Sequence, residues 1–206
     1  MKGQEATGTA TMEDAVEDAA PGASRPMRAD ARRNYDRLVA AAKEVFATHG
    51  GDASMEAIAK TAGVGVGTLY RHFPKRIDVV EAVYRTDVDE LVEAAQRAVQ
   101  EADPLQALIS WLDAFVRYAK SKRTLLTELH EAFEKNPSLK LASRERINQA
   151  IDVVLVPAQK AGVIRPDVDG SDLMQLLGPM CTSPTLSENQ SERLLAVIVD
   201  GLRQPE

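Results

Sequence analysis

The stretch SMEAIAKTAGVGVGTLYRHFPKR, residues 54–76, decides the fold. Its pattern predicts two short helices joined by a tight turn. Ile58 and Ala59 lie on the first helix, and the small side chain at 59 lets a second helix pack close. Gly63 can adopt the positive φ that such a turn requires, and Leu69 fills the space between the helices. This spacing is typical of a helix-turn-helix, whose second helix lies in the DNA major groove.

The second helix of this stretch and the residues just after it carry polar, aromatic and cationic side chains away from the buried side. Thr68 and Tyr70 can donate hydrogen bonds to a phosphate or a base edge. Lys75 and Arg76 can neutralise phosphate charge. These residue types therefore predict a surface that binds the DNA backbone and reads bases.

The segment IAKTAGVGVGTLYRHFPKR, residues 58–76, resembles the signature of the tetracycline-repressor (TetR) family of bacterial regulators. That signature has an Ile-Ala pair, then Ala-Gly-Val, then Gly-Thr-Leu-Tyr-x-His-Phe, and a basic residue three positions after the Phe. The chain departs from it at Gly65, where Ser is usual, and at Arg76, where Lys is usual. The first departure removes an N-cap hydroxyl, and the second keeps the charge.

The resemblance adds residues to the DNA-binding surface, including His72 as a phosphate contact. An exposed Ser54 at a helix N-terminus also suits phosphate binding. The DNA-contacting residues that we expect are Ser54, Val66, Gly67, Thr68, Tyr70, His72, Lys75 and Arg76.

Composition favours an all-α chain. Of its 206 residues, 44% are hydrophobic and only 4% are aromatic, and helical periodicity is common while alternating runs are few. We expect about nine helices in three parts: a disordered N-terminal tail at 1–30, a helix-turn-helix DNA-binding domain at 31–76, and an effector-binding and dimerisation domain at 77–206. The single Cys181 cannot form an internal disulfide, which predicts a cytoplasmic protein.

The charge is divided unevenly along the chain, whose net charge is −6. Residues 31–76 carry eight Lys or Arg and four Asp or Glu, or +4, whereas residues 1–30 carry −3 and residues 77–206 carry −7. A cationic segment in an acidic chain suits DNA binding at one end. Four arginines at the end of the tail also suggest an arm that reaches the minor groove, or else a solvated tail: Arg25, Arg28, Arg32 and Arg33.

Helical periodicity predicts a first helix from Arg32 and a series of helices beyond the DNA-binding segment. Ser121 is expected to cap a helix that Asn136-Pro137 ends, and a linking segment is expected before the next helix. Pro157 falls inside that helix and should kink it. The expected ranges are 76–100, 122–135, 143–161, 171–180 and 188–202, and a further helix is expected to open at Asp103-Pro104.

Large apolar side chains in these helices form either an ordinary core or a ligand cavity. The resemblance implies a small-molecule cavity in the helical body. His130 can bond a ligand there or lie on the surface. The expected ligand-binding residues are Trp111, Phe115, Tyr118, His130, Phe133 and Met174. No cofactor and no metal site are expected.

The last two helices are apolar around more than one face, so they are either buried or at a subunit interface. The resemblance implies the interface, with a homodimer held by a four-helix bundle. Together these features predict a ligand-responsive DNA-binding regulator of the repressor kind that leaves a near-palindromic operator when a small apolar effector binds. The alternatives are an enzyme that uses the helical cavity and an interaction module that does not bind DNA. An enzyme is disfavoured because the sequence offers no nucleophile elbow, metal set or cofactor loop.

Overall fold

The computed structural model describes residues 24–100 and 103–204, and this part of the chain is built from helices. The all-α prediction is confirmed, since strand-like pairing in the described residues is limited to an isolated bridge between Ile164 and Arg203. The helices are α1 (Ser24–His49), α2 (Met55–Ala62), α3 (Val66–His72), α4 (Arg76–Ala98), α5 (Pro104–Thr124), α6 (Leu126–Lys135), α7 (Pro137–Lys160), α8 (Gly170–Leu177) and α9 (Glu188–Leu202), with short 3-10 turns at Gly50–Asp52 and Gly178–Cys181.

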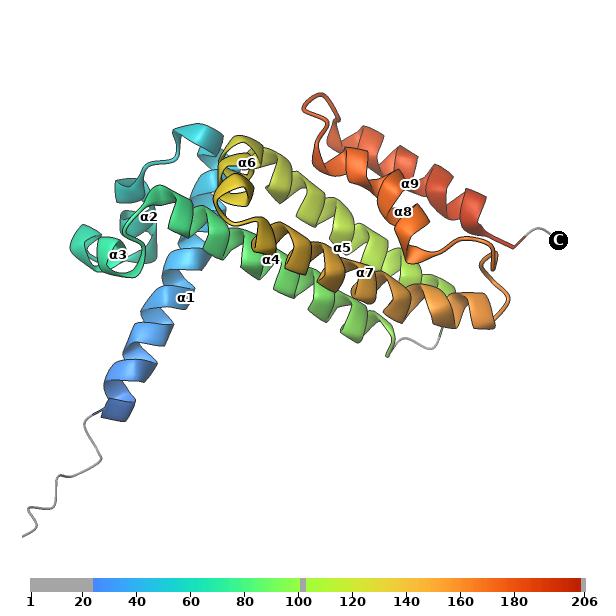
Figure 1. Ribbon diagram of the computed structural model, residues 1–206, viewed down its shortest axis with the longest axis horizontal. Helices are drawn as coiled ribbons and strands as arrows, with labels where there is room; N and C mark the ends of the chain where they lie inside the picture. Colours follow the sequence, from blue (N-terminus) through green and yellow to red (C-terminus); the bar gives the residue numbers. More distant parts are fainter. Residues whose placement is uncertain (1–23, 101–102, 205–206) are drawn as a thin grey trace, which may run out of the picture.

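Helices α1, α2 and α3 form a head at one end of the molecule (Figure 1). Ser54 caps α2, because its hydroxyl oxygen accepts a hydrogen bond from the Ala57 N–H at 3.0 Å. Gly63 ends α2 with φ of 65° and ψ of 36°, a left-handed conformation that glycine adopts without strain. Leu69 of α3 is fully buried, and α3 packs against α2. The turn and the buried plug lie where the sequence predicts them.

Helix α1 begins at Ser24, eight residues before the predicted start at Arg32. Residues 24–30 are therefore helical, although the sequence analysis placed them in a disordered tail. Pro26 falls in the first turn, where its missing N–H would have no helical partner in any case. The remainder of the expected tail, residues 1–23, lies outside the described residues.

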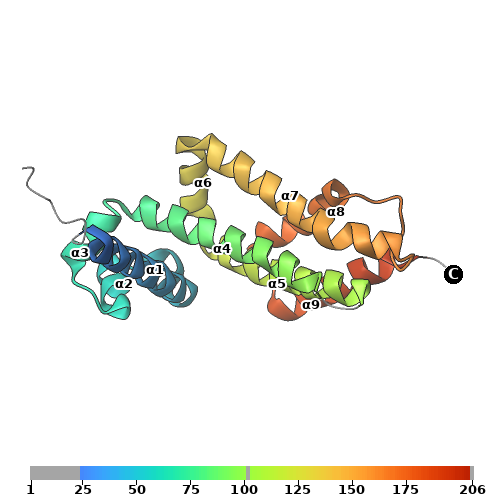
Figure 2. The same cartoon turned by 90° about the horizontal axis from the view of Figure 1, so that it is seen from below.

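Helix α4 runs from the head along the body, where α5 and α7 pack beside it (Figures 1 and 2). The helices share one core, and Trp111 of α5 is fully buried with its Nε1–H donating to the Leu91 carbonyl of α4 at 3.1 Å. This single continuous helix leads from the head into the body.

The boundaries around α6 differ from the prediction. Ser121 does not cap a helix, because α5 continues to Thr124 and α6 begins at Leu126. The expected linking segment is also helical, since α7 begins at Pro137. Asn136 ends α6 and at the same time caps α7 through its side-chain oxygen, which accepts from the Leu139 N–H. The Asn-Pro pair is thus a start signal as much as a stop signal.

Helix α8 packs against α7 and helix α9 against α5, on the body and apart from the head (Figures 1 and 2). Helix α8 ends at Leu177 rather than Met180, because Pro179 follows in a 3-10 turn. Helix α9 has the predicted bounds, and the Arg165 N–H donates to the Leu202 carbonyl at 2.9 Å, which fixes its end to the loop after α7. Within the described residues, no helix combines the length and the apolar character needed to cross a membrane.

Candidate nucleic-acid interface and cavity

The outer face of α3 is open to solvent. Val66 and Tyr70 are 38% and 43% exposed, and Arg71 is also exposed. Gly67 lies between them, and a Cβ built on it would meet no atom within 4 Å. The face therefore offers a short bare stretch of backbone flanked by an aromatic ring and a cation. This arrangement suits close approach to a DNA groove.

Three of the other predicted contacts lie at the edge of this face. Thr68 and His72 are half-buried, and the His72 ring packs edge-on to Tyr35 of α1 at a centroid distance of 6.4 Å. Ser54 is exposed at the N-terminus of α2. Its oxygen accepts the capping bond, so its O–H remains able to donate to a phosphate.

The two cations that follow α3 have different surroundings. Lys75 is exposed, and its backbone N–H donates to the Asp78 carboxylate at 2.8 Å. Arg76 is half-buried and donates to the Ala53 carbonyl, and to Glu128 Oε1 at 3.1 Å. Its guanidinium carbon also lies 5.0 Å from the centre of the Phe46 ring. Arg76 therefore holds the head against α6, a role that the sequence analysis did not assign to it.

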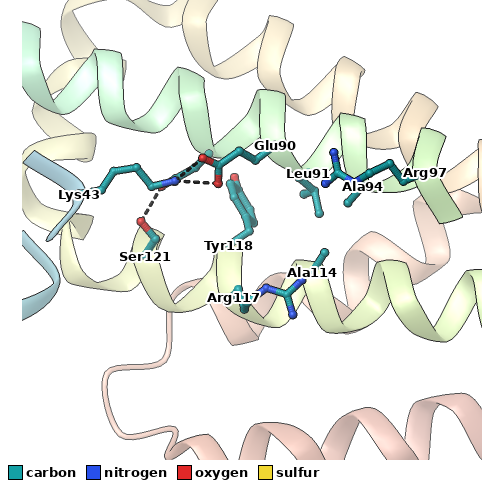
Figure 3. A pocket seen from close by; sticks show the side chains of 10 residues that line it. Lys43, Glu90, Leu91, Ala94, Arg97, Ala114, Arg117, Tyr118 and Ser121 are labelled. Carbon is teal, nitrogen blue, oxygen red and sulfur yellow. Dashed lines mark hydrogen bonds and ion pairs between the residues drawn. The ribbon is translucent and has the colours of Figure 1, made fainter. Parts of the chain in front are cut away.

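A second polar connection joins the head to the body (Figure 3). Lys43 of α1 lies 2.8 Å from Asp87 and 2.7 Å from Glu90, both on α4. Ser121 of α5 donates to Asp87 at 2.5 Å. A hollow of about 450 Å³ opens beside this group, lined also by Arg117.

The two charges at the centre of this connection have shifted pKa values. Burial raises the pKa of Asp87 above its ordinary value, although bonds from Lys43 and Ser121 oppose the rise. Burial would lower the pKa of Lys43, but its hydrogen bonds to Asp87 and Glu90 outweigh this and raise it. Helices α1, α4 and α5 are therefore joined through Lys43, Asp87 and Ser121, and the charges of Lys43 and Asp87 stabilise each other.

A separate cavity of about 330 Å³ lies among α4, α5, α6, α7 and α8. Its aromatic side is formed by Tyr84, Tyr118 and Phe133, with the Tyr84 and Phe133 rings 5.3 Å apart in an edge-to-face arrangement. Met174 of α8 contributes to the wall. The volume lies at the lower end of the range for small-molecule sites.

The structure brings together half of the expected ligand-binding residues. Tyr118, Phe133 and Met174 line this cavity. Trp111 and Phe115 are fully buried in the core behind it, with the Phe115 ring 5.6 Å from that of Tyr118. His130 is exposed and is not part of the cavity wall.

Sequence reasoning missed several residues of the wall: Tyr84, Lys122, Lys140, Arg144, Ile147 and Gln175. Lys140 was missed because the segment that contains it was expected to be a linker. Once α7 is known to start at Pro137, the spacing of Lys140, Arg144 and Ile147 places all three on one helix face.

Two family models match the chain. Residues 38–83 match the model described as "Bacterial regulatory proteins, tetR family". Residues 103–204 match the model described as "Transcriptional regulator SbtR-like, C-terminal domain". The first match covers the helix-turn-helix, and the second covers the helices of the body from α5 onward.

Solved structures and curated relatives agree with these matches. The TetR transcriptional regulator SCO0520 from Streptomyces coelicolor is 36% identical, with a TM-score of 0.72 over 84% of this chain and 99% of that one. A TetR regulatory protein from Mycobacterium vanbaalenii is 34% identical, with a TM-score of 0.69 over 86% and 99%. The regulator UidR of Escherichia coli is 25% identical over 183 residues, which are 86% of this chain and 93% of UidR.

Proposed function

The chain belongs to the tetR family of bacterial regulatory proteins and is a helix-turn-helix transcriptional regulator; we propose that it is a repressor that binds a near-palindromic operator as a dimer and responds to a small molecule. The observation that carries this proposal is the open outer face of α3. A helix that buries Leu69 and leaves Val66, Gly67 and Tyr70 uncovered has the form of a recognition helix.

We assign base reading and backbone contacts to different parts of the head. Exposure of the start of α3 supports the groove-facing role of Val66, Gly67, Thr68 and Tyr70. Phosphate contacts are assigned to Ser54, Tyr70, His72 and Lys75. Arg76 keeps a smaller part in DNA binding, because a phosphate would have to compete with its bonds to Ala53 and Glu128.

Apolar side chains exposed on the last two helices support the proposed dimer. Leu176 of α8 is 53% exposed, while Leu194 and Val197 of α9 are 42% and 68% exposed. Such side chains on two consecutive helices are better covered by a second copy than by water. A two-fold dimer would place two heads on one side of a DNA duplex, with recognition helices one turn (~34–36 Å) apart.

Helix α6 connects the cavity with the head. Phe133 lies on the cavity wall, while Glu128, five residues earlier, bonds Arg76 at the start of α4. A ligand that displaces Phe133 would therefore move the contact that positions the head. Reversing a 99:1 preference for the DNA-binding arrangement requires about 5.5 kcal/mol of differential affinity.

A footprint on the DNA upstream of the chain's own reading frame tests the proposal. The purified dimer should protect two half-sites related by a near-palindrome and separated by about one turn (~10 base pairs). Protection of a single half-site by a monomer would contradict the dimeric arrangement. No protection anywhere in that region, and none in a random-sequence selection, would contradict the proposed DNA binding.

A further inference from the structure

The cavity among α4 to α8 has an uneven charge. Within the described chain, its lining contains the cations Lys122, Lys140 and Arg144 but no Asp or Glu. The surrounding domain, residues 77–206, carries a net charge of −7. Three cations converging without a counter-charge in an otherwise acidic domain are therefore a local feature of this cavity. The positive electrostatic potential of the cavity favours the binding of an anion.

The cations of the wall are not engaged elsewhere in the described part of the chain, apart from one ring contact. Lys140 and Arg144 form no ion pair or hydrogen bond with residues 24–100 or 103–204. Lys122 Nζ lies 5.9 Å from the centre of the Tyr118 ring. By contrast, Arg146 on the same helix α7 pairs with Asp89 at 2.6 Å. The cavity cations remain available to a ligand.

The aromatic and the cationic residues that line the cavity differ in burial. Tyr84 and Tyr118 are 4% and 5% exposed, so the aromatic side is deep. Lys140 and Arg144 are exposed, so they lie at the mouth, with half-buried Lys122 between the two zones. An apolar ring or chain would fit the deep zone, and a negative group would meet the cations at the mouth.

We propose that this cavity binds a small amphipathic carboxylate, with its apolar part against Tyr84 and Phe133 and its carboxylate held by Lys140 and Arg144. Arg144 can bind the carboxylate with two parallel N–H donors, and Lys140 adds a point charge. This inference deepens the proposed function, on which it rests, by naming the class of the effector. It replaces the wholly apolar effector that the sequence analysis expected.

Paired ligands test the charge requirement directly. Thermal unfolding of the full chain should be measured with 1-naphthoate, indole-3-acetate and decanoate, and with the primary amide of each. We expect at least one carboxylate to raise the unfolding temperature while its amide, of the same shape, does not. For decanoate, which neither absorbs nor emits in this range, fluorescence of the single tryptophan, Trp111, gives the dissociation constant, since Phe115 links its ring to Tyr118. Equal effects of acids and amides, or no effect of any acid, would overturn the proposal.

Matched variants locate the binding site. Lys140→Gln and Arg144→Gln should each weaken carboxylate binding about tenfold, the usual worth of one charge-assisted hydrogen bond. Lys160→Gln is the control, because Lys160 is an exposed cation on the same helix outside the cavity wall. If it weakens binding as much, attraction by general charge explains the result and the assigned site is wrong.

A DNA-affinity measurement with the same ligands separates this proposal from the proposed function. Carboxylate binding that leaves operator affinity unchanged would support the ligand class and contradict ligand control of DNA binding. Release of DNA by amides as effectively as by acids would support ligand control and contradict the ligand class.

Discussion

Arg76 Nη2 lies 3.1 Å from Glu128 Oε1, so the first residue of α4 is bound to α6 across the boundary between head and body. The same guanidinium donates to the Gly51 carbonyl at 3.1 Å and to the Ala53 carbonyl, just before α2. One side chain therefore contacts the turn that positions α2 and the helix that lines the cavity. Movement of α6 would be felt by the head through this contact.

Arg76→Ala should lower the free energy of unfolding by about 1–3 kcal/mol. The reason is that the Ala53 carbonyl and the Glu128 carboxylate lose their hydrogen-bond donor. Urea unfolding measures this. Lys75→Ala is the control, since Lys75 is exposed and should change stability little. Equal stability of the two variants would show that the Arg76 contacts carry no weight.

The contribution of Lys43 to the free energy of unfolding should be lost at alkaline pH. Burial opposes its charge, but the bonds to Asp87 and Glu90 raise its pKa above 10.5 in the folded state. A raised folded-state pKa gives a contribution that is full below 10.5 and is lost as pH rises through the folded value. Lys43→Met should therefore be less stable than the parent at neutral pH, and the difference should shrink above 10.5. A difference that stays constant across this range would contradict the assignment.

Gly67→Ala separates the needs of the fold from those of DNA binding. A Cβ there meets nothing within 4 Å, so the variant should gain roughly 1 kcal/mol of stability from higher helix propensity. It should also bind operator DNA more weakly, because the methyl group blocks the backbone from the groove. Gly65→Ser is the control, since it places a capping hydroxyl at the start of α3 and should keep DNA affinity. Unchanged operator affinity in Gly67→Ala would remove Gly67 from the interface.

Val197→Asp should dissociate the dimer. Val197 is 68% exposed on α9, and a charge there would be buried without a partner in the proposed interface. Leu141→Asp is a matched control, because Leu141 is also 68% exposed but lies on α7, which is not one of the two helices of the proposed interface. Sedimentation equilibrium should give a monomer for the first variant and a dimer for the second. Two dimers, or two monomers, would contradict the interface.

The head could be predicted from sequence because its signals are local. The cap at Ser54, the left-handed Gly63 and the plug at Leu69 act within one short segment. The predicted helix bounds around Ser121 were wrong. In a sequence, a serine inside a long helix looks like an N-cap when the hydrogen-bond partner of its side chain is unknown. That partner is Asp87 on another helix, at 2.5 Å, and no local pattern shows it.

The residues of the candidate sites likewise divide into those that could be predicted from the sequence and those that could not. Tyr118, Phe133 and Met174 were expected in a cavity because the family resemblance implies one in the helical body, and they lie together. Lys140, a cation of the same cavity, was missed because it belongs to a stretch taken for a linker. Arg76 shows a different limit of sequence reasoning. A cation that follows a recognition helix can bind a DNA phosphate as well as it binds the Glu128 carboxylate. Only the packing of α6 against the head distinguishes the two.

The central claim is that the open face of α3 reads duplex DNA, and affinity as a function of salt tests it most directly. The full chain should be titrated with its upstream operator duplex and with a scrambled duplex, in parallel with Lys75→Ala. We predict that the operator binds at least about 10³-fold more tightly than the scrambled duplex. We also predict that Lys75→Ala lowers the slope of log affinity against log salt by roughly 0.9 for each lost phosphate contact. Equal affinity for both duplexes, with the same salt slope for the parent and the variant, would contradict the account.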